Sequence, residues 1–303
     1  MDNIKIKSYC KINLSLKVLK KLNSGYHNII SLITFCDLHD VISISRIRNL
    51  KDEISVSGKF KKGINKKSNT ITKVLNLLRS IKLLENQAFK INVRKNIPHG
   101  SGLGGGSSNA ADLLNYFNSK MKLKLSKNKI KKLAGQIGFD VPVNLEKRNT
   151  FLTGKKGEIL RLNRKFRLNV LIVYPNLICS TKKIYEKNKK FTLLKSQSYF
   201  HKKNAKKSLM KPQSFFNEKN NKKLINFLKN ENNDLEKTVI KIYPKIKKII
   251  DCIKSQKGCY FSRITGSGSA CIGIFSNTRN AIYAQKAIRS KYPKYWSVVS
   301  KTI

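Results

Sequence analysis

Acidic residues are scarce in this sequence, and it has no long apolar segment. Sixteen Asp and Glu stand against 64 Lys and Arg, which gives a formal net charge of +48. No stretch approaches the roughly 18 apolar residues that a membrane-spanning helix needs. The N-terminal residues run directly into a strand-like pattern, which is not typical of a signal peptide. We therefore expect a cytoplasmic protein with no membrane partner.

Cysteine and histidine are too scattered to form a metal-binding motif. The six cysteines contain no C-x-x-C pair, and the four histidines show no metal-ligand spacing with them. This pattern indicates ordinary reduced thiols and no metal held by the protein alone. The length of 303 residues and the hydrophobic content of 40% predict a globular chain of two domains.

The positive charge admits two interpretations. A strongly basic chain is typical of proteins that bind nucleic acid or another polyanion. However, the lysines are spread along the whole chain together with abundant Asn and Ile, which favours a compositional bias of the genome. We expect no nucleic-acid partner, although a nucleic-acid-binding protein remains the alternative from a different class. In either case the charge would attract a phosphorylated substrate.

Residues 98–111 form a glycine-rich stretch, Pro-His-Gly-Ser-Gly-Leu-Gly-Gly-Gly-Ser-Ser-Asn-Ala-Ala. It lies between an alternating strand pattern that ends at Arg94 and a helical pattern that continues to Phe117. Glycines before a helix can turn several backbone N–H groups toward one anion, and the helix N-terminus adds a partial positive charge. We expect Ser107 or Ser108 to cap the helix and a phosphate to bind the loop. A flexible linker is the alternative interpretation.

The glycine-rich stretch matches neither of the two common nucleotide motifs. No Gly-Lys-Ser/Thr follows it, which excludes a Walker A loop. No acid lies about 20 residues further on to bind a ribose, because the next acids after Asp112 are Asp140 and Glu146. The sequence therefore predicts a different nucleotide-binding fold.

Asp140 is an isolated carboxylate in a basic region. Between Glu85 and Asp140 the sequence contains one other acidic residue, Asp112, which lies inside the helix expected after the loop. Pro142 favours the first turn of a helix, which would place Asp140 near a helix N-terminus, where the ionised form is stabilised. The alternatives are a catalytic carboxylate and a helix cap.

The remaining pattern gives the order of the other elements. We expect strands within 4–18, 29–36 and 40–45, a helix at 68–84 capped by Ser68, and a helix at 127–137 capped by Ser126. Further expectations are a hairpin at 151–162, a strand at 168–174, a helix broken at Pro244, a strand–glycine turn–strand unit at 261–275, a helix at 278–292 and a final strand. The acid-free, lysine-rich stretch 187–217 predicts a mobile, solvated insert, with a polyanion-binding arm as the alternative.

Five blocks of the chain resemble the GHMP kinases, in the same order and across nearly the whole length. They are Lys11-Ile12-Asn13-Leu14, Gly25-Tyr26-His27, Pro98 through Ala111, Asp140-Val141-Pro142 and Thr265-Gly266-Ser267-Gly268-Ser269. The glycine block is common to the family. Gly-Tyr-His soon after Lys-Ile-Asn-Leu resembles more specifically the members that act on a cytidine-diphosphate-linked sugar alcohol. The stretch from Glu186 to Phe216 has no clear counterpart, and His99-Gly100-Ser101 differs from some versions of the loop.

The resemblance implies an α+β, two-domain architecture. Residues 1–160 would form an N-terminal, ribosomal-protein-S5-like α/β domain that binds ATP. Residues 161–303 would form a C-terminal, ferredoxin-like α/β domain that includes the lysine-rich insert. The implied reaction is ATP-dependent phosphorylation of the 2-hydroxyl of a cytidine-diphosphate-linked methylerythritol, in non-mevalonate isoprenoid precursor biosynthesis. The implied partners are small-molecule substrates, and a homodimer is left open. Another small-alcohol kinase, of the homoserine or mevalonate type, is the alternative within the family.

The same resemblance implies roles for individual residues. Asp140 would orient the attacking hydroxyl and accept its proton, while Lys11 would hold that carboxylate and offset charge on the transferred phosphoryl group. Mg²⁺ would be carried by the phosphates of ATP. The residues expected to bind ATP are Asn69, Lys95, Pro98, Gly100, Gly102, Leu103, Gly104, Gly105, Gly106, Ser107, Ser108 and Asn109. Those expected to bind the acceptor are Asn13, Tyr26, His27, Thr181, Tyr185, Gly266 and Ser267. On spacing alone, an exposed Tyr26-His27 pair at a turn could equally be incidental.

Overall fold

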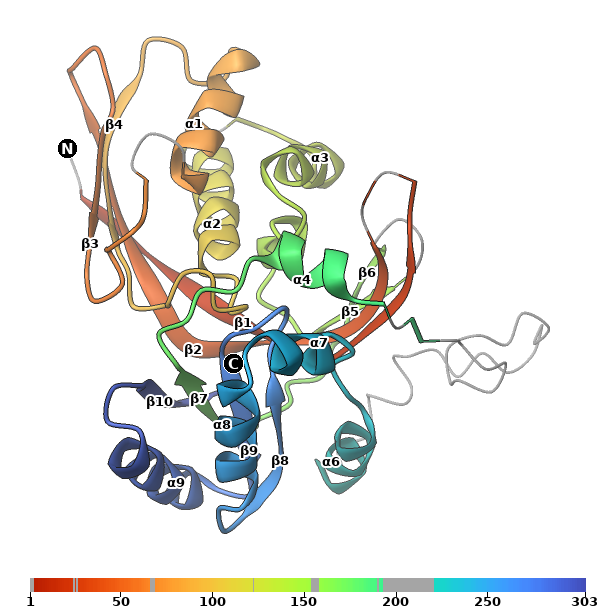
Figure 1. Cartoon of the computed structure of the whole chain (residues 1–303). Coiled ribbons are helices and arrows are strands. Elements are labelled where there is room, and N and C mark those ends of the chain that lie inside the picture. The colour runs from red at the N-terminus through yellow and green to blue at the C-terminus, as the bar shows by residue number, and fades with distance from the viewer. Residues whose placement is uncertain are drawn as a thin grey trace. The chain divides into compact units, whose positions relative to one another are not determined.

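The computed structural model describes residues 3–23, 25, 27–65, 69–121, 123–153, 158–189, 191–192 and 221–303 (Figure 1). Two compact units are formed. Unit 1 contains Met1–Lys11, Cys36–His99 and Leu103–Lys147, and unit 2 contains Ile12–Phe35, Gly100–Gly102 and Arg148–Ile303. These units are not two contiguous halves of the chain. Residues 12–35 and 100–102, which were expected within a 1–160 domain, belong to unit 2.

The two longest strands run through both units. β1 covers Ile4–Lys21 and β2 covers His27–Ile47. The sequence predicted a break between strands 29–36 and 40–45, but β2 is continuous there. The polar residue Asp40 does not end the strand because its carboxylate is buried and accepts backbone N–H groups from Asn96 and Ile97 at 2.7 and 2.9 Å.

Unit 1 is a sheet covered by helices. β4 (Ala88–Arg94) pairs with the second half of β2 on one edge and with β3 (Glu53–Ser57) on the other. The helices α1 (Thr70–Ser80), α2 (Gly105–Lys120) and α3 (Lys127–Ile137) lie on one side of these strands in Figure 1. Their apolar faces and the sheet enclose one core, in which the rings of Phe89 and Phe117 meet edge to face at 5.0 Å.

The helix starts test the capping predictions. Ser126 caps α3 as predicted, since its side chain accepts the N–H of Lys129. The prediction that Ser107 or Ser108 caps α2 is wrong, because the helix already begins at Gly105 after a left-handed Gly104. α1 is capped by Asn69, and the predicted cap Ser68 lies outside the described residues.

Unit 2 contains a hairpin on the first half of β2 and a second sheet. β5 (Thr150–Thr153) pairs with β2 and with β6 (Glu158–Arg161), as the predicted hairpin requires; its turn, 154–157, lies outside the described residues. The second sheet is antiparallel throughout, in the order β10 (Trp296–Lys301), β7 (Asn169–Tyr174), β9 (Cys271–Phe275) and β8 (Cys259–Ile264). This sheet confirms the predicted hairpin around the second glycine loop.

Helices pack against this second sheet. α8 (Lys245–Lys254) contacts β8 and β9, whereas α9 (Thr278–Lys291) contacts β7 and β10. α7 (Leu235–Ile242) ends before Pro244, which confirms the predicted break. α4 (Thr181–Lys187) and α6 (Asn221–Asn230) flank the lysine-rich insert, of which residues 190 and 193–217 lie outside the described part of the chain.

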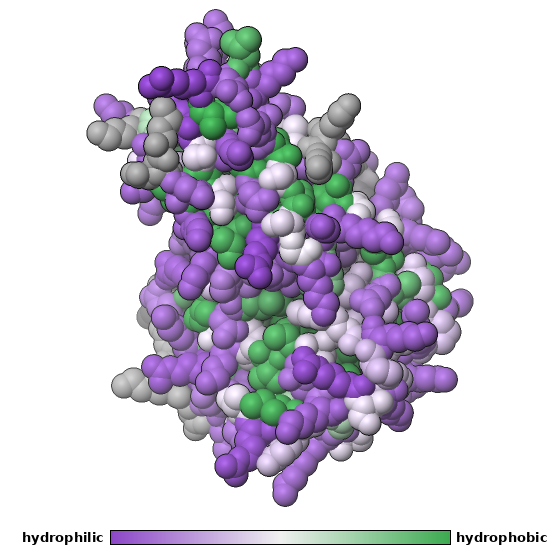
Figure 2. All heavy atoms as spheres, turned by 90° about the vertical axis from the view of Figure 1, so that its left-hand side faces the viewer, coloured by the Kyte–Doolittle hydropathy of each residue, from purple (hydrophilic) through white to green (hydrophobic). Residues whose placement is uncertain are grey.

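Hydrophilic side chains dominate the face shown in Figure 2, and hydrophobic ones occur there as small areas between them. Most buried side chains of the described residues are hydrophobic, as a globular chain requires. Within the described residues, no helix combines the length and the apolar character that crossing a bilayer demands.

Candidate functional site

The structure brings Lys11 and Asp140 together in unit 1. Lys11 Nζ lies 3.5 Å from Asp140 Oδ2, although the two residues are far apart in the sequence. The lysine sits on β1, and its backbone N–H donates to the carbonyl of Leu103 at 3.0 Å. Asp140 precedes the short 3-10 helix Pro142–Leu145, so the carboxylate lies near a helix start as predicted.

The glycine loop lies against the same lysine. Gly104 has a φ of +69°, and a Cβ at this position would come within 2.8 Å of Lys11 Cγ and 3.0 Å of Lys11 Cε. The first bond of α2 runs from the N–H of Ser108 to the carbonyl of Gly104. The N–H groups of residues 105–107 precede that bond and point out of the helix start, where the helix dipole favours an anion. This arrangement fits a phosphate next to the Lys11–Asp140 pair.

Two other loop residues have structural contacts. Ser108 Oγ donates to the carbonyl of Tyr9 at 2.6 Å and so fastens α2 to β1. Asn109 is buried, and no hydrogen-bond partner is found for its Oδ1 among the described residues. A buried amide oxygen of this kind is a candidate ligand for a cation or a hydroxyl group.

Lys95 and Asn69 lie near the glycine loop: Lys95 directly follows β4, and Asn69 directly precedes α1. Lys95 Nζ forms a buried ion pair with Asp40, and it also lies beside Gly105, where a Cβ would be 3.3 Å away. Asn69 Oδ1 accepts the N–H groups of Ile71 and Thr72 and caps α1. The side chain of Thr70 then donates to the carbonyl of Gly106 at 2.9 Å. Both residues therefore support the loop, and their contact with ATP stays a prediction.

In unit 2 the two glycine loops of the sequence meet. Gly102 has a φ of +83°, and a Cβ there would lie only 2.2 Å from the carbonyl oxygen of Thr265. The N–H of Ala270 donates to the carbonyl of Ser101 at 2.9 Å. Asn13 joins this group, since its backbone N–H donates to Thr265 Oγ1 at 2.8 Å and its side chain donates to Ser31. Only glycine fits at position 102 without displacing the second loop.

Aromatic rings gather around His27 in the same unit. The ring centroid of Tyr185 lies 4.9 Å from that of His27, and the ring of Phe191 lies nearly parallel to His27 at 6.3 Å. Burial, with a smaller effect of Lys21, lowers the pKa of His27 from its ordinary value, which favours the neutral ring. Tyr26 lies outside the described residues. The sequence did not single out Phe191, because it falls in the stretch expected to be a solvated insert.

Helix α4 connects the aromatic group to the second glycine loop. Thr181 and Tyr185 are one turn apart on this helix, and Thr181 Oγ1 lies 2.9 Å from Ser267 Oγ. A single helix face therefore carries two of the predicted acceptor-binding residues. Gly266 lies next to Asn13, where a Cβ would be 3.4 Å from Asn13 Oδ1. The structure thus groups the described acceptor residues within unit 2.

A segment that the sequence analysis did not single out supports this group. Asn233 Nδ2 donates to the carbonyls of Gly266 at 2.8 Å and Ile264 at 3.2 Å. Asp234 Oδ2 accepts the N–H of Val18 on β1 and the hydroxyl of Thr192, next to Phe191. Polar residues at the start of a helix usually serve as caps, so no local pattern in the sequence indicates these distant contacts.

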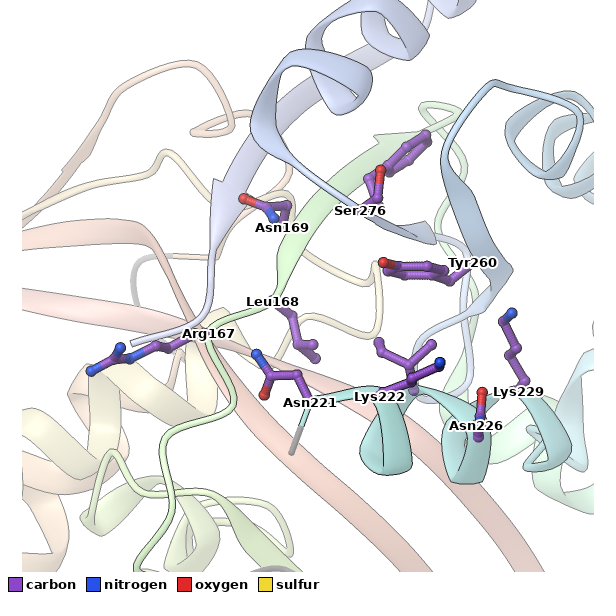
Figure 3. A pocket seen from close by; sticks show the side chains of 11 residues that line it. Arg167, Leu168, Asn169, Asn221, Lys222, Asn226, Lys229, Tyr260 and Ser276 are labelled. Atoms are coloured by element: carbon purple, nitrogen blue, oxygen red, sulfur yellow. The ribbon is translucent and has the colours of Figure 1, made fainter. Parts of the chain in front are cut away.

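One pocket of unit 2 lies apart from all predicted residues. It has a volume of about 450 Å³ and is bordered by α6 and by the ends of β7, β8 and β9 (Figure 3). Lys229 Nζ lies 5.4 Å from the ring centroid of Tyr260 at its wall. None of the residues expected to bind ATP or the acceptor lines this pocket, so it is not the predicted site.

Comparison with known proteins places the chain in a family. Residues 69–146 match the GHMP kinases N terminal domain, and residues 215–294 match the GHMP kinases C terminal domain. These two matches cover the glycine loop and the second glycine loop. The chain belongs to the GHMP kinases, and the predicted α+β, two-domain architecture is confirmed.

Two full-length relatives indicate a particular kind of GHMP kinase. The chain is 39% identical over 303 residues to 4-diphosphocytidyl-2-C-methyl-D-erythritol kinase of Pelagibacter ubique (strain HTCC1062), with 100% of both chains covered. It is 32% identical to the kinase of the same name from Caldanaerobacter subterraneus subsp. tengcongensis, over 99% of this chain and 97% of the relative. Matches of this length leave no major part of the chain without a counterpart.

Solved structures agree on the fold. A 4-(cytidine 5'-diphospho)-2C-methyl-D-erythritol kinase matches with a TM-score of 0.72 at 21% identity, covering 98% of this chain and 99% of that one. A homoserine kinase from Cytophaga hutchinsonii also has a TM-score of 0.72, at 16% identity, over 100% of this chain and 95% of that one. Because the two scores are equal, the fold alone does not choose between these acceptors.

Proposed function

We infer that the chain is an ATP-dependent kinase that phosphorylates 4-diphosphocytidyl-2-C-methyl-D-erythritol. The observation that carries this inference is the full-length similarity to kinases of that name, combined with a paired Lys11 and Asp140 beside a glycine loop. The similarity supports the choice of acceptor, and the geometry of unit 1 supports the proposed phosphoryl transfer. We place the transfer on the 2-hydroxyl, in the synthesis of isoprenoid precursors.

The chemistry in unit 1 is positioning and charge stabilisation. The acceptor hydroxyl attacks the γ-phosphorus of ATP, and Asp140 orients that hydroxyl and takes its proton. Lys11 holds the carboxylate in place from 3.5 Å and offsets negative charge on the transferring group. The helix start at 105–107 and the loop glycines donate N–H groups to the other phosphates. Most of the rate enhancement in phosphoryl transfer comes from such effects.

Recognition of the cytosine base belongs to the aromatic group of unit 2. The rings of His27 and Tyr185 offer flat surfaces for stacking, and a neutral imidazole can both donate and accept a hydrogen bond. Tyr26 is proposed for the same role from its place in the Gly-Tyr-His block. Asn13, Thr181, Gly266 and Ser267 complete the proposed acceptor contacts.

Mg²⁺ fits the oxygen ligands of unit 1 but is not caged by them. The described residues contain no cluster of three or more His, Cys, Asp or Glu side chains that could hold a metal. The Asp140 carboxylate and the buried Asn109 Oδ1 are oxygen ligands of the type that Mg²⁺ accepts beside phosphates. We propose that Mg²⁺ arrives with ATP and neutralises charge on its phosphate oxygens.

The proposed location is the cytoplasm. All six cysteines are free thiols, which is typical of a reducing compartment that also contains ATP. The sequence leaves a homodimer open, and light scattering of the purified protein across a concentration series would decide the oligomeric state.

The deciding experiment is a coupled kinase assay with purified protein, ATP and Mg²⁺. Turnover should require the cytidine diphosphate group, with homoserine and mevalonate as control acceptors. Equal turnover of either control would overturn the assignment of the acceptor. Absence of any kinase activity, together with salt-dependent binding to random duplex DNA that persists at saturating ATP, would favour a nucleic-acid-binding protein.

A further inference from the structure

Asp112 and Lys147 form an ion pair inside unit 1 that the proposed reaction does not use. Lys147 Nζ lies 2.9 Å from Asp112 Oδ1, and the two side chains are only 18% and 12% exposed. Asp112 lies in the middle of α2, the helix that begins at the glycine loop. It is also the only acid between Glu85 and Asp140. In a chain with four times as many bases as acids, a buried carboxylate at this place calls for a specific explanation.

Lys147 connects the pair to Asp140. Its Nζ also donates to the carbonyl of Asn144 at 2.6 Å. The side chain of Asn144, which is itself buried, donates to the carbonyl of Asp140 at 2.7 Å. Three successive polar contacts therefore join the carboxylate in α2 to the backbone of the proposed catalytic carboxylate.

Asp112 connects the pair to the strand that carries Lys11. Ser8 Oγ donates to Asp112 Oδ2 at 2.8 Å. Ser108, one turn before Asp112 on α2, donates to the carbonyl of Tyr9 at 2.6 Å and lies 3.5 Å from the same carboxylate oxygen. The carboxylate thus fixes α2 against β1 three residues before Lys11.

The geometry points to Asp112 and Lys147 as positioning residues that set the placement of Asp140 relative to Lys11 and the glycine loop. This inference rests on the proposed function, because it assigns the two residues to the same phosphoryl-transfer site. Neither residue is proposed to touch a substrate. Their effect is to hold β1, α2 and the turn at Asp140 in fixed positions relative to one another.

The energetics of the pair support a positioning role. Burial raises the pKa of Asp112, against the opposing effects of Lys147, Ser8 and Ser108. Removing two charges from water costs free energy that their attraction often only offsets, so a buried ion pair contributes little to stability by itself. What it does supply is a defined geometry, because both charges remain satisfied only in one arrangement of the three segments.

The test is steady-state kinetics of Lys147→Met, Asp112→Asn and the double variant, each with both substrates. Lys147→Met keeps the aliphatic stem and removes both polar contacts. We expect kcat to fall about tenfold, with KM for ATP and for the acceptor within twofold of wild type, because misplacement by a fraction of an ångström acts mainly on the transition state. The double variant should lose no more than the worse single one, since the two residues act as one group.

A matched control is available in the other unit. Lys247 and Asp251 on α8 form an equally short pair of 2.8 Å that is exposed, and Lys247→Met should leave kcat unchanged. If Lys147→Met does not fold, Lys147→Gln, whose side chain is neutral and one atom shorter than that of lysine, takes its place. A kcat within twofold of wild type, additive losses in the double variant, or a rise in KM with unchanged kcat would overturn the inference. Wild-type turnover of the acceptor, measured alongside, tests the proposed function separately.

Discussion

Lys11 and Asp140 are close neighbours with very different exposure. Their charged atoms lie 3.5 Å apart, yet the lysine side chain is 6% exposed and the aspartate side chain 43%. The lysine is therefore the fixed partner, held by the loop and the strand. The carboxylate keeps an open side, and a substrate hydroxyl could approach it there.

Asp140→Asn removes the charge without changing the shape of the side chain. We expect kcat to fall by on the order of 10²-fold or more with little change in either KM, because proton acceptance matters mainly in the transition state. Glu85→Gln, at an exposed carboxylate of the same unit, is the control and should behave as wild type. Near-normal turnover of Asp140→Asn would remove this residue from the role of base.

Gly104→Ala tests the contact between the loop and Lys11. The left-handed backbone costs a non-glycine residue about 1–2 kcal/mol, and the added methyl group would press on the lysine stem. We expect a lower melting temperature and a kcat reduced by about tenfold. Gly135→Ala is the matched control, because this helical position in α3 has nothing within 4 Å of a Cβ and should be stabilised by about 0.5–1 kcal/mol. Wild-type kinetics in Gly104→Ala would contradict the close packing.

Tyr185→Ala tests the aromatic group. Loss of one stacking surface for a base costs about 1–3 kcal/mol, so KM for the cytidylylated acceptor should rise roughly 5- to 150-fold while KM for ATP stays constant. Tyr185→Phe should retain most of the affinity, because the ring remains. Tyr283→Ala, at an exposed tyrosine of α9, serves as the control. An unchanged acceptor KM would show that this ring does not hold the base.

The protonation of His27 can be followed directly by NMR. Burial and Lys21 lower its pKa in the folded protein, so its ring signals should titrate with a midpoint below 6.5. The unfolded chain then binds the proton more readily, and the stability contributed by this group rises as pH increases from the folded-state pKa toward 6.5. His27→Gln identifies the signal. A midpoint at or above 6.5 would contradict the described environment.

Asn233→Ala removes the support of the second glycine loop. It leaves the carbonyls of Ile264 and Gly266 without this donor, at a cost of about 1–3 kcal/mol for an unsatisfied buried group. A lower melting temperature and a raised acceptor KM are expected, with KM for ATP unchanged. Asn232→Ala, at the exposed neighbouring side chain, is the control. If ATP and acceptor KM values rise together, the segment has a general structural role instead.

Local features of the fold could be predicted from the sequence. Alternation and helical spacing located β7, α3, α9 and the break at Pro244, because these signals depend on neighbouring residues. The caps of α1 and α2 could not be located in this way. Thr70, next to the cap Asn69, contacts Gly106, and the left-handed Gly104 lies against Lys11, so both helix starts involve residues that are distant in the sequence.

The residues of the candidate site that belong to a family motif could be predicted from the sequence. The resemblance supplied Lys11, Asp140 and the two glycine loops, and the structure brings the first pair together. The supporting residues Asp40, Asp112, Lys147 and Asn233 act through contacts with distant parts of the chain. No local spacing encodes such contacts, so only the folded structure shows them.

The passage of β1 and β2 through both units has a consequence for how the chain folds during synthesis. Asn13 bonds to Thr265, 252 residues later, and the N–H of Ile303 donates to the carbonyl of Phe35. Residues 12–35 are therefore synthesised well before the partners that they contact. Contacts of such long range slow folding. Unit 2 also combines residues 12–35 with residues 148–303, so cutting the chain near residue 160 would yield two incomplete fragments.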